Sequence, residues 1–292
     1  MRFGTYYFFQ APPGHDHADI IRRELRQIEW TEELGFDSIW LTEHHFIEYG
    51  LSVDPATLAA AAAARTSRIR LGLAAAIVPF HHPLRLAEQM ALVDIISNGR
   101  LDVGVGLGWS EDEYDAVGVP FRARGRRGDE FLKCLKAIWT EPEVEFRGEF
   151  YRLPKSIVEP KPVQQPHPPI TIGGYGPHVI KRAVTLGDGF NGGNVPLAQV
   201  APLVAQLRDT ARAVGRDPDT LHIVSRGSYV VHDAPQGAER RPLWGTLAEI
   251  REDIQRYADA GLTELFLEPN FQPGGAKLDQ VLDVMEQLAP KA

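Results

Sequence analysis

Two adjacent histidines are the residues of this chain best suited to chemistry. They lie in Thr42-Glu43-His44-His45-Phe46, directly after a run typical of a buried strand. Neighbouring side chains of an extended chain point to opposite faces, so only one imidazole can face a given site, and the pair is poorly placed to chelate one metal. An imidazole at a strand end can transfer a proton near neutral pH or donate to a developing anion. Alternatively, both histidines only cap the strand through backbone hydrogen bonds.

A glycine-rich turn indicates a site for an anion. The turn consists of Gly173, Gly174, Tyr175 and Gly176. It precedes Pro177, a residue typical of the first turn of a helix, and free amides at a helix N-terminus attract phosphate. A plain glycine turn is the alternative. Residues 104–109 also alternate glycine, but they lack the spacing of a dinucleotide-binding motif, so they indicate only close backbone approach.

Small side chains in one predicted strand leave room for a flat ligand. Ala74, Ala75 and Ala76 stand where a barrel strand usually carries Val, Ile or Leu. Close packing of a helix against these alanines is the alternative. Aromatic residues near strand ends can line an apolar substrate pocket, although core packing explains aromatics equally well. These aromatic residues are Tyr7, Phe9, Phe46, Phe80 and Trp109.

Eight β-branched or aromatic runs, each followed by an amphipathic stretch, predict parallel strands with helices outside them. The expected strands are 2–8, 38–42, 69–78, 101–106, 169–173, 188–191, 221–231 and 264–267. The expected helices are 19–34, 54–65, 83–96, 124–140, 177–186, 196–214, 247–260 and 275–288. Eight such pairs favour a single α/β domain over residues 1–292, a (β/α)8 TIM barrel with function at the carboxyl ends of the strands. The proline-rich residues 141–168 predict a surface insertion after the fourth strand–helix pair.

Composition and charge disfavour several classes of protein. The chain has 292 residues, of which 43% are hydrophobic and 24% charged, enough to build a full-sized core. A net charge of −8 disfavours binding to nucleic acid or to an anionic membrane. The single cysteine, Cys134, cannot form an internal disulfide, and the longest apolar run, residues 58–64, is too short to span a bilayer. With no signal peptide expected, a cytoplasmic protein is predicted.

Nearly the whole chain resembles the bacterial luciferase-like flavin-dependent oxidoreductases. The most specific match is residues 36–50, which resemble the family segment that carries the catalytic histidine. Residues 74–79 with 82–85 resemble the family strand that carries a non-proline cis peptide beneath the isoalloxazine ring. The resemblance therefore implies a cis bond at Ala74–Ala75, with Ala75–Ala76 as the second choice, and the ring lying across the alanines. It also implies that His44 assists oxygen chemistry at the flavin.

The same resemblance assigns the cofactor phosphate to the glycine turn at 173–176 and places Gly106 and Leu107 beside the cofactor. Many FMN-dependent relatives have an arginine where this chain has Leu107, and a leucine cannot neutralise phosphate. Four further segments resemble the branch that uses the deazaflavin coenzyme F-420. They are residues 104–109, 117–121, 160–164 and 186–190. The resemblance leaves FMN and F-420 as alternatives, with reduced FMN favoured by the histidine segment.

These features predict a two-component monooxygenase that oxidises a small organic substrate with O2 and reduced FMN, supplied by a separate flavin reductase. An F-420-dependent hydride-transfer oxidoreductase is the alternative. Two further hypotheses are a metal-dependent barrel hydrolase that uses His44, His81 or His82, and a non-catalytic flavoprotein.

Two expectations concern the surroundings of the site. Residues 232–246 are predicted to form a lid that excludes water, with Trp244 near the ligand and with Arg240 and Arg241 more typical of solvated surface. The resembled family dimerises through early helices, so the small residues at 58–64 suit a contact between subunits. Packing within the chain explains these alanines equally well, and a homodimer is the expected state.

Overall fold

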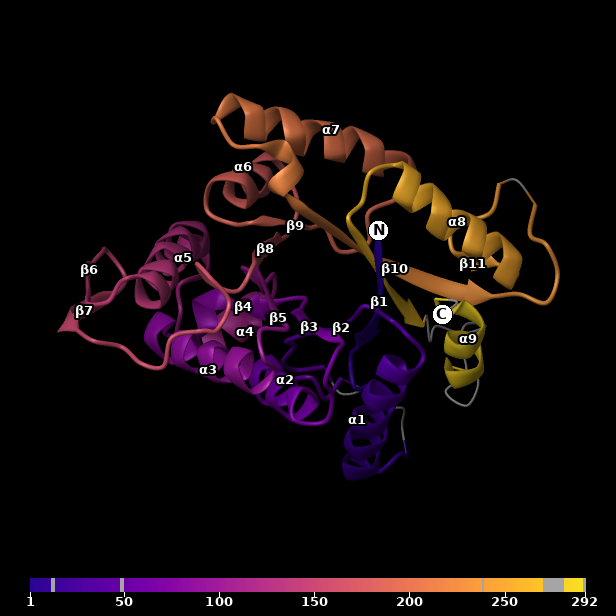
Figure 1. Cartoon of the computed structure of the whole chain (residues 1–292), viewed down its shortest axis with the longest axis horizontal. Helices are drawn as coiled ribbons and strands as arrows, with labels where there is room; N and C mark the ends of the chain where they lie inside the picture. The colour runs from indigo at the N-terminus through magenta and orange to yellow at the C-terminus, as the bar shows by residue number, and fades with distance from the viewer. Residues whose placement is uncertain (12–13, 48–49, 238, 270–280, 291–292) are drawn as a thin grey trace.

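Eight parallel strands close into a barrel in the computed structural model, which describes residues 1–11, 14–47, 50–237, 239–269 and 281–290 (Figure 1). The barrel strands are β1 (Arg2–Tyr7), β2 (Ser38–Leu41), β3 (Arg70–Leu73), β5 (Leu101–Gly106), β8 (Ile170–Gly173), β9 (Gly189–Asn191), β10 (His222–Val231) and β12 (Glu264–Pro269). They pair in this order around the ring, and the β9–β10 and β12–β1 pairings close it. The predicted (β/α)8 TIM barrel is confirmed.

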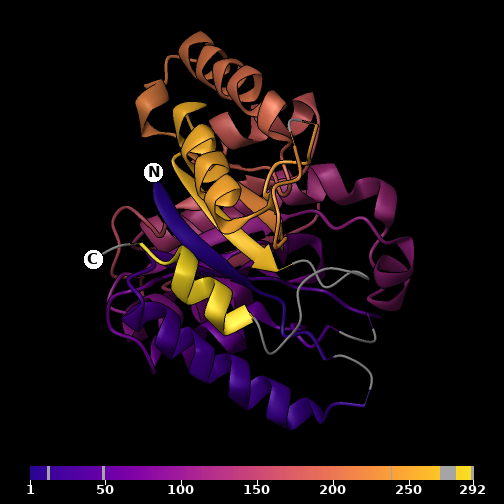
Figure 2. The same ribbon diagram turned by 90° about the vertical axis from the view of Figure 1, so that its right-hand side faces the viewer.

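Helices cover the outside of the barrel, as the sequence periodicity predicts. They are α1 (His17–Glu33), α2 (Pro55–Ala63), α3 (Pro83–Ile96), α5 (Arg124–Thr140), α6 (Pro177–Thr185), α7 (Leu197–Ala213), α8 (Leu247–Asp259) and α9 (Val281–Leu288). The bounds of α3 and α5 are those predicted. Figure 2 shows the yellow helix α9 between α1 and α8, beside strand β1. The first residues predicted for α9, 275–280, lie outside the described part of the chain.

The predicted strand 69–78 is divided in two. Strand β3 ends at Leu73, and β4 (Ala76–Ile77) then pairs with β5. Gly72 lies opposite Asp102 while Ala76 lies opposite Val105, so this strand contains one residue more than its neighbour and the ladder is interrupted. The cis peptide Ala74–Ala75 expected from the family resemblance lies in this interruption and is confirmed.

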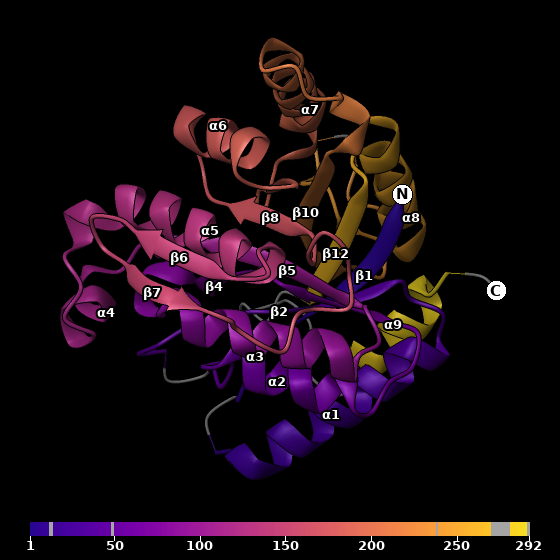
Figure 3. The ribbon, with the colours of Figure 1, turned by 60° about the vertical axis from the view of Figure 1, so that its left-hand side comes forward.

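The insertion at 141–168 carries secondary structure that sequence reasoning did not predict. Strands β6 (Val144–Arg147) and β7 (Arg152–Ser156) form an antiparallel hairpin beside α5 (Figure 3). The carboxylate of Glu130 on α5 accepts hydrogen bonds of 2.7 to 2.8 Å from three successive backbone amides, 149–151, and so fastens the hairpin to the helix. A short helix, α4 (Glu111–Ala116), was also not predicted.

Charged and aromatic side chains fill the barrel below its carboxyl end. At the amino end the buried carboxylate of Glu264 accepts hydrogen bonds from Ser38 at 2.5 Å and Trp40 at 2.6 Å, and pairs with Arg2 at 2.6 Å. Above this polar layer the Phe266 ring stacks on Trp40, with ring centres 5.0 Å apart, and on Tyr6 at 5.7 Å. Because these rings are buried, they close the floor of the barrel.

Gly104 tests the close packing of this wall. A Cβ at this position would lie 1.7 Å from the carbonyl oxygen of Leu73, so the strands β3 and β5 would have to separate. We expect Gly104→Ala to lower the free energy of unfolding by about 3 kcal/mol or more. Urea unfolding followed by circular dichroism measures this change.

Gly125→Ala is the matched control. Gly125 lies in helix α5, and the nearest atom to an added Cβ is on Arg182 at 3.8 Å. An alanine in a helix interior is favoured over glycine by up to about 1 kcal/mol, so this variant should be at least as stable as the parent. Equal unfolding midpoints for the two variants would contradict the account of the β3–β5 contact.

Candidate active site

A cavity of about 480 Å³ opens at the carboxyl ends of the barrel strands, and residues in, or directly after, all eight strands line it. This is the end at which barrel enzymes carry their active sites. Among the predicted site residues, the cavity brings together His44, Ala74, Ala75 and Trp109. It also includes, from the predicted cofactor set, Gly106, Leu107, Gly173, Gly174 and Tyr175.

His44 lines the cavity, whereas His45 does not and instead contacts Glu43 and the Phe80 ring. The backbone amide of His44 donates to the carbonyl of Ser52 at 3.0 Å, and its ring meets Phe8 edge-on with ring centres 5.1 Å apart. Burial, with a smaller effect from the nearby cation Arg226, lowers the pKa of His44 to about 4. The imidazole is therefore neutral at neutral pH and can accept a proton there.

A buried carboxylate holds the segments around His44. Glu43 accepts hydrogen bonds from the amide of Ile77 at 2.7 Å, from His81 at 3.0 Å and from His45 at 3.2 Å. Burial favours the neutral acid, but the hydrogen bonds from His45 and His81 outweigh it and hold the pKa of Glu43 below its ordinary value. Sequence reasoning missed this role, although strand alternation puts Glu43 and His45 on the same face.

Alanine and glycine form a smooth wall in the cavity. Ala74 and Ala75 line it together with Gly106 and Gly173. A Cβ on Gly106 would lie 3.4 Å from the Ala75 methyl group, so the two positions are neighbours and this part of the wall carries no side chain larger than a methyl group, which leaves room for a planar ring. Ala76, expected beside the other alanines, has instead a fully buried side chain (0% exposed) that joins the core, because the strand alternates its faces.

The glycine turn at 173–176 has the features expected of an anion site. Gly174 and Gly176 adopt φ values of +129° and +90°, which favour glycine. Gly176 is the N-cap of α6 and gives it no side-chain cap; Pro177 has no amide hydrogen and the Val179 amide donates to the Gly176 carbonyl, so the His178 amide is the one in the first turn left for an anion. Gly176 itself does not line the cavity, but Gly174 and Tyr175 do.

Arg124 is a cavity residue that sequence reasoning missed. It is the first residue of α5; its guanidinium carbon lies 3.7 Å from the Phe121 ring centre, and Nη1 donates to the Phe121 carbonyl. Leu107 packs so closely on the same helix that a Cβ on Gly128 would lie 2.4 Å from it. The structure therefore provides a guanidinium near the position where Leu107 supplies none.

Most of the predicted substrate aromatics do not line the cavity. Phe9 is fully buried in the core, and the Tyr7 hydroxyl makes a 2.6 Å hydrogen bond to Thr31 on α1, since alternate residues of β1 face outward. Phe80 packs edge-on against a tyrosine in the wall behind, and Phe46 is 71% exposed outside the cavity. The residue of β1 that does line the cavity is Tyr6.

The predicted lid at 232–246 is anchored to helix α8 in its described part. Arg240 pairs with the buried Asp253 at 2.5 Å, and the amide of Leu243 donates to the same carboxylate at 2.7 Å. Arg241 lies over the Trp244 ring, 4.8 Å from its centre. Arg240 is therefore an internal ion-pair partner rather than solvated surface, and no described residue of this segment lines the cavity.

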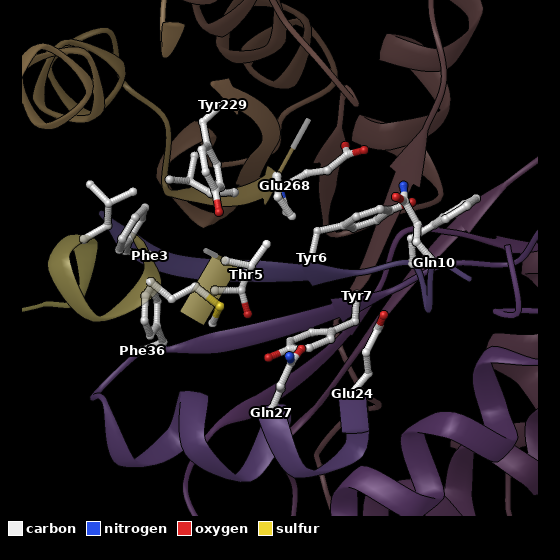
Figure 4. A pocket seen from close by; sticks show the side chains of 16 residues that line it. Phe3, Thr5, Tyr6, Tyr7, Gln10, Glu24, Gln27, Phe36, Tyr229 and Glu268 are labelled. Atoms are coloured by element: carbon white, nitrogen blue, oxygen red, sulfur yellow. The ribbon is translucent and has the colours of Figure 1, made fainter. Parts of the chain in front are cut away.

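A second, narrow cavity of about 50 Å³ lies between β1, α1 and α9 (Figure 4). It is mainly apolar, but the carboxyl group of Glu24 lies against it, and burial raises the pKa of Glu24 to about 8. Tyr6 lines both cavities, so the two share one aromatic wall.

The described residues contain no group of three histidine, cysteine or acidic side chains that could hold a metal ion, so the hydrolase hypothesis lacks a ligand set there. In the same part of the chain, no helix is both long and apolar enough to cross a membrane.

Comparisons with known proteins agree with this geometry. A flavin-dependent trigonelline monooxygenase, oxygenase component, from Acinetobacter baylyi is 37% identical over 206 residues, which are 70% of this chain and 55% of that protein. This chain spans about half the length of the curated relatives it matches. The monooxygenase RslO1 from Streptomyces bottropensis has a TM-score of 0.88 at 30% identity, covering 99% of this chain and 98% of that one.

An F420-dependent secondary alcohol dehydrogenase has a TM-score of 0.81, covering 98% of this chain and 97% of that one, but its 18% identity shows the fold alone. The family model described as luciferase-like monooxygenase matches residues 1–242. With more than half of its length matched, the chain belongs to the luciferase-like monooxygenase family.

Proposed function

We propose that the chain is the oxygenase component of a two-component monooxygenase, which uses O2 and reduced FMN from a separate reductase to oxidise a small organic substrate. The observation that carries this proposal is that a neutral imidazole, His44, and a flat wall of alanine and glycine face one cavity at the carboxyl end of the barrel. The name of the Acinetobacter relative, an oxygenase component, supports the separate reductase. When bound, reduced FMN supplies the electrons that activate dioxygen.

The residues of the cavity fit a flavin nucleotide. Ala74 and Ala75 would support one face of the planar ring, and the amides that follow Gly174 would bind the phosphate. Arg124 would supply the cation that Leu107 does not. The exposed rings of Trp109 and Tyr175 border the cavity, where they would shield a bound ligand from water.

His44 would act as a base. Because its pKa is about 4, it stays unprotonated at neutral pH, and its imidazole is available to accept a proton from the substrate. The hydrogen bonds that Glu43 accepts from Ile77 and His81 would keep the segment around His44 in place during this transfer.

F-420 is the second candidate cofactor, because Leu107 stands where many FMN-dependent relatives have an arginine. Fluorescence titration of the protein with FMN and with F-420, each oxidised and reduced, separates the two candidates. Saturable binding of reduced FMN with O2 uptake coupled to substrate supports the proposal. Preference for F-420 without O2 uptake supports hydride transfer instead, and binding of neither cofactor contradicts both.

His44→Gln should lower the turnover number by a factor of about 100 or more, since general acid–base groups contribute about 10² to 10⁴. The dissociation constant of FMN should stay within about twofold, because the alanine wall and the phosphate turn are intact. His17→Gln, on the exposed start of α1, is the control and should leave turnover unchanged. Full turnover in His44→Gln would reject the catalytic role and favour the non-catalytic flavoprotein.

Arg124→Met should weaken FMN binding by a factor of about 10 to 100, as expected for a charge-assisted hydrogen bond to phosphate. Riboflavin, which lacks the phosphate, should bind the variant and the parent equally. The matched control is Arg126→Met in the same helix, since Arg126 is exposed and pairs with Glu149. An equal loss for FMN and riboflavin would mean that Arg124 holds the shape of the cavity rather than the phosphate.

The stability of the protein should report the low pKa of His44. The unfolded chain takes up a proton as the pH falls through 6.5, whereas folded His44 does so only near pH 4. Between pH 7 and pH 5 the parent should therefore lose about 2 kcal/mol of unfolding free energy more than His44→Gln. Urea denaturation at the two pH values measures this difference, and parallel losses in both proteins would show that the imidazole is not buried as described.

A further inference from the structure

We infer that Arg226 is a specificity-determining residue of the cavity, and that it binds a carboxylate on a planar organic substrate beside His44. Calling this ligand the substrate rests on the proposed function; the carboxylate site itself rests on the geometry and charge of the cavity wall.

Arg226 lies on the half of the cavity that carries His44. It is opposite Phe266 in the β10–β12 register; β12 pairs with β1, and β1 pairs with β2, whose end carries His44. The side chain of Arg226 is 29% exposed, and its guanidinium carbon lies 5.2 Å from the centre of the Tyr6 ring. Its charge contributes to the low pKa of His44, so the two groups are within electrostatic reach.

The ion pair with Glu268 and a side-chain hydrogen bond with Tyr6 use only part of the hydrogen-bonding capacity of Arg226. Glu268 is the one acidic side chain among the described residues within ion-pairing distance, and the contact joins Nε to Oε2 at 3.0 Å. Neither atom has a hydrogen-bond partner, so the pair is misaligned. Glu268 borders the second cavity (Figure 4) and not the one at the barrel mouth. A guanidinium has five N–H donors, and its forked edge suits a carboxylate.

A second donor lies near Arg226 without a protein acceptor. Asn191 on β9 lies opposite Val224, two residues before Arg226 and on the same face of β10. Its Oδ1 accepts from the amide of Gly193, which directs Nδ2 elsewhere, and this buried Nδ2 has no partner. Asn191 is 5% exposed and lines the cavity. Buried donors are normally satisfied, so an unpaired donor beside a cation indicates an acceptor on the ligand.

The charges of the cavity wall favour an anion on this side. The charged side chains that line the cavity are Glu43, Arg124 and Arg226. Glu43 is occupied by the amide of Ile77 and by two imidazoles. Arg124 begins α5 next to Gly125, whose carbonyl accepts from Arg182 of α6, the helix that follows the glycine turn. Arg226 is therefore the cation left for a substrate, and the rings of Tyr6 and Phe266 beside it suit a planar apolar body.

The test uses benzoate and the neutral benzamide, which differ little in shape, as probes of the full chain without cofactor. Calorimetric titration of the parent should give benzoate binding at least 10-fold tighter than benzamide binding. Arg226→Met should weaken benzoate binding at least 10-fold and leave benzamide unchanged, while Arg226→Lys should restore part of the loss. Arg85→Met, on the exposed surface of α3, is the matched control and should leave both constants unchanged.

Removing Arg226 leaves the Glu268 carboxylate without its cation. The double variant Arg226→Met with Glu268→Gln is therefore titrated as well, and its benzoate and benzamide affinities should match those of Arg226→Met. Titration with FMN separates the two ligands of the cavity: its dissociation constant should stay within twofold in every Arg226 variant. Loss of FMN affinity with benzoate binding retained would assign Arg226 to the cofactor and overturn the inference. Equal affinity of the parent for benzoate and benzamide would also overturn it, whereas failure of the parent to bind any flavin contradicts the proposed function alone.

Discussion

The geometry of the cavity depends on one buried carboxylate, that of Glu43. It ties the end of β2 to the amide of Ile77 in β4 and to His81, and it also holds His45. His44 and the Ala74–Ala75 wall belong to the segments joined in this way. The hydrogen bonds to Glu43 therefore fix the position of the His44 imidazole relative to this wall. Such a network is stable when every member is satisfied, because a buried donor left without an acceptor is destabilising.

The lower half of the barrel supports this arrangement without taking part in it. The ion pair and hydrogen bonds around Glu264 join the starts of three strands, and the stacked rings of Trp40, Phe266 and Tyr6 separate them from the cavity. The cavity therefore has a base of buried, closely packed side chains, whereas the exposed rings of Trp109 and Tyr175 lie in the loops at its rim.

The sequence was sufficient for the architecture because caps and periodicity mark the element bounds, as Asp54 and His82 do for the starts of α2 and α3. It was insufficient for the inward-facing set. Strand β1 and its continuation carry aromatic residues on both faces at positions 6–9. The alternation of the strand therefore does not show which residues face inward, and the sequence predicts Tyr7 and Phe9, rather than Tyr6, as pocket residues. The sequence did not predict Arg124 and Asn191 as cavity residues. They reach the cavity only because the barrel closes, and no pattern within a short stretch of sequence indicates which residues this closure brings together. The hairpin β6–β7 was missed because its strands are short and charged.

Helix α5 has a consequence for how relatives of this chain can diverge. Its first residue, Arg124, borders the cavity; Gly128 receives the side chain of Leu107; and Glu130 holds the backbone of the surface hairpin. Helix α5 thus links the surface hairpin β6–β7 to Arg124, the guanidinium proposed to bind an anion. Changes in the length or sequence of the hairpin would shift this helix, and so would change ligand affinity in a protein whose cavity residues are all unaltered.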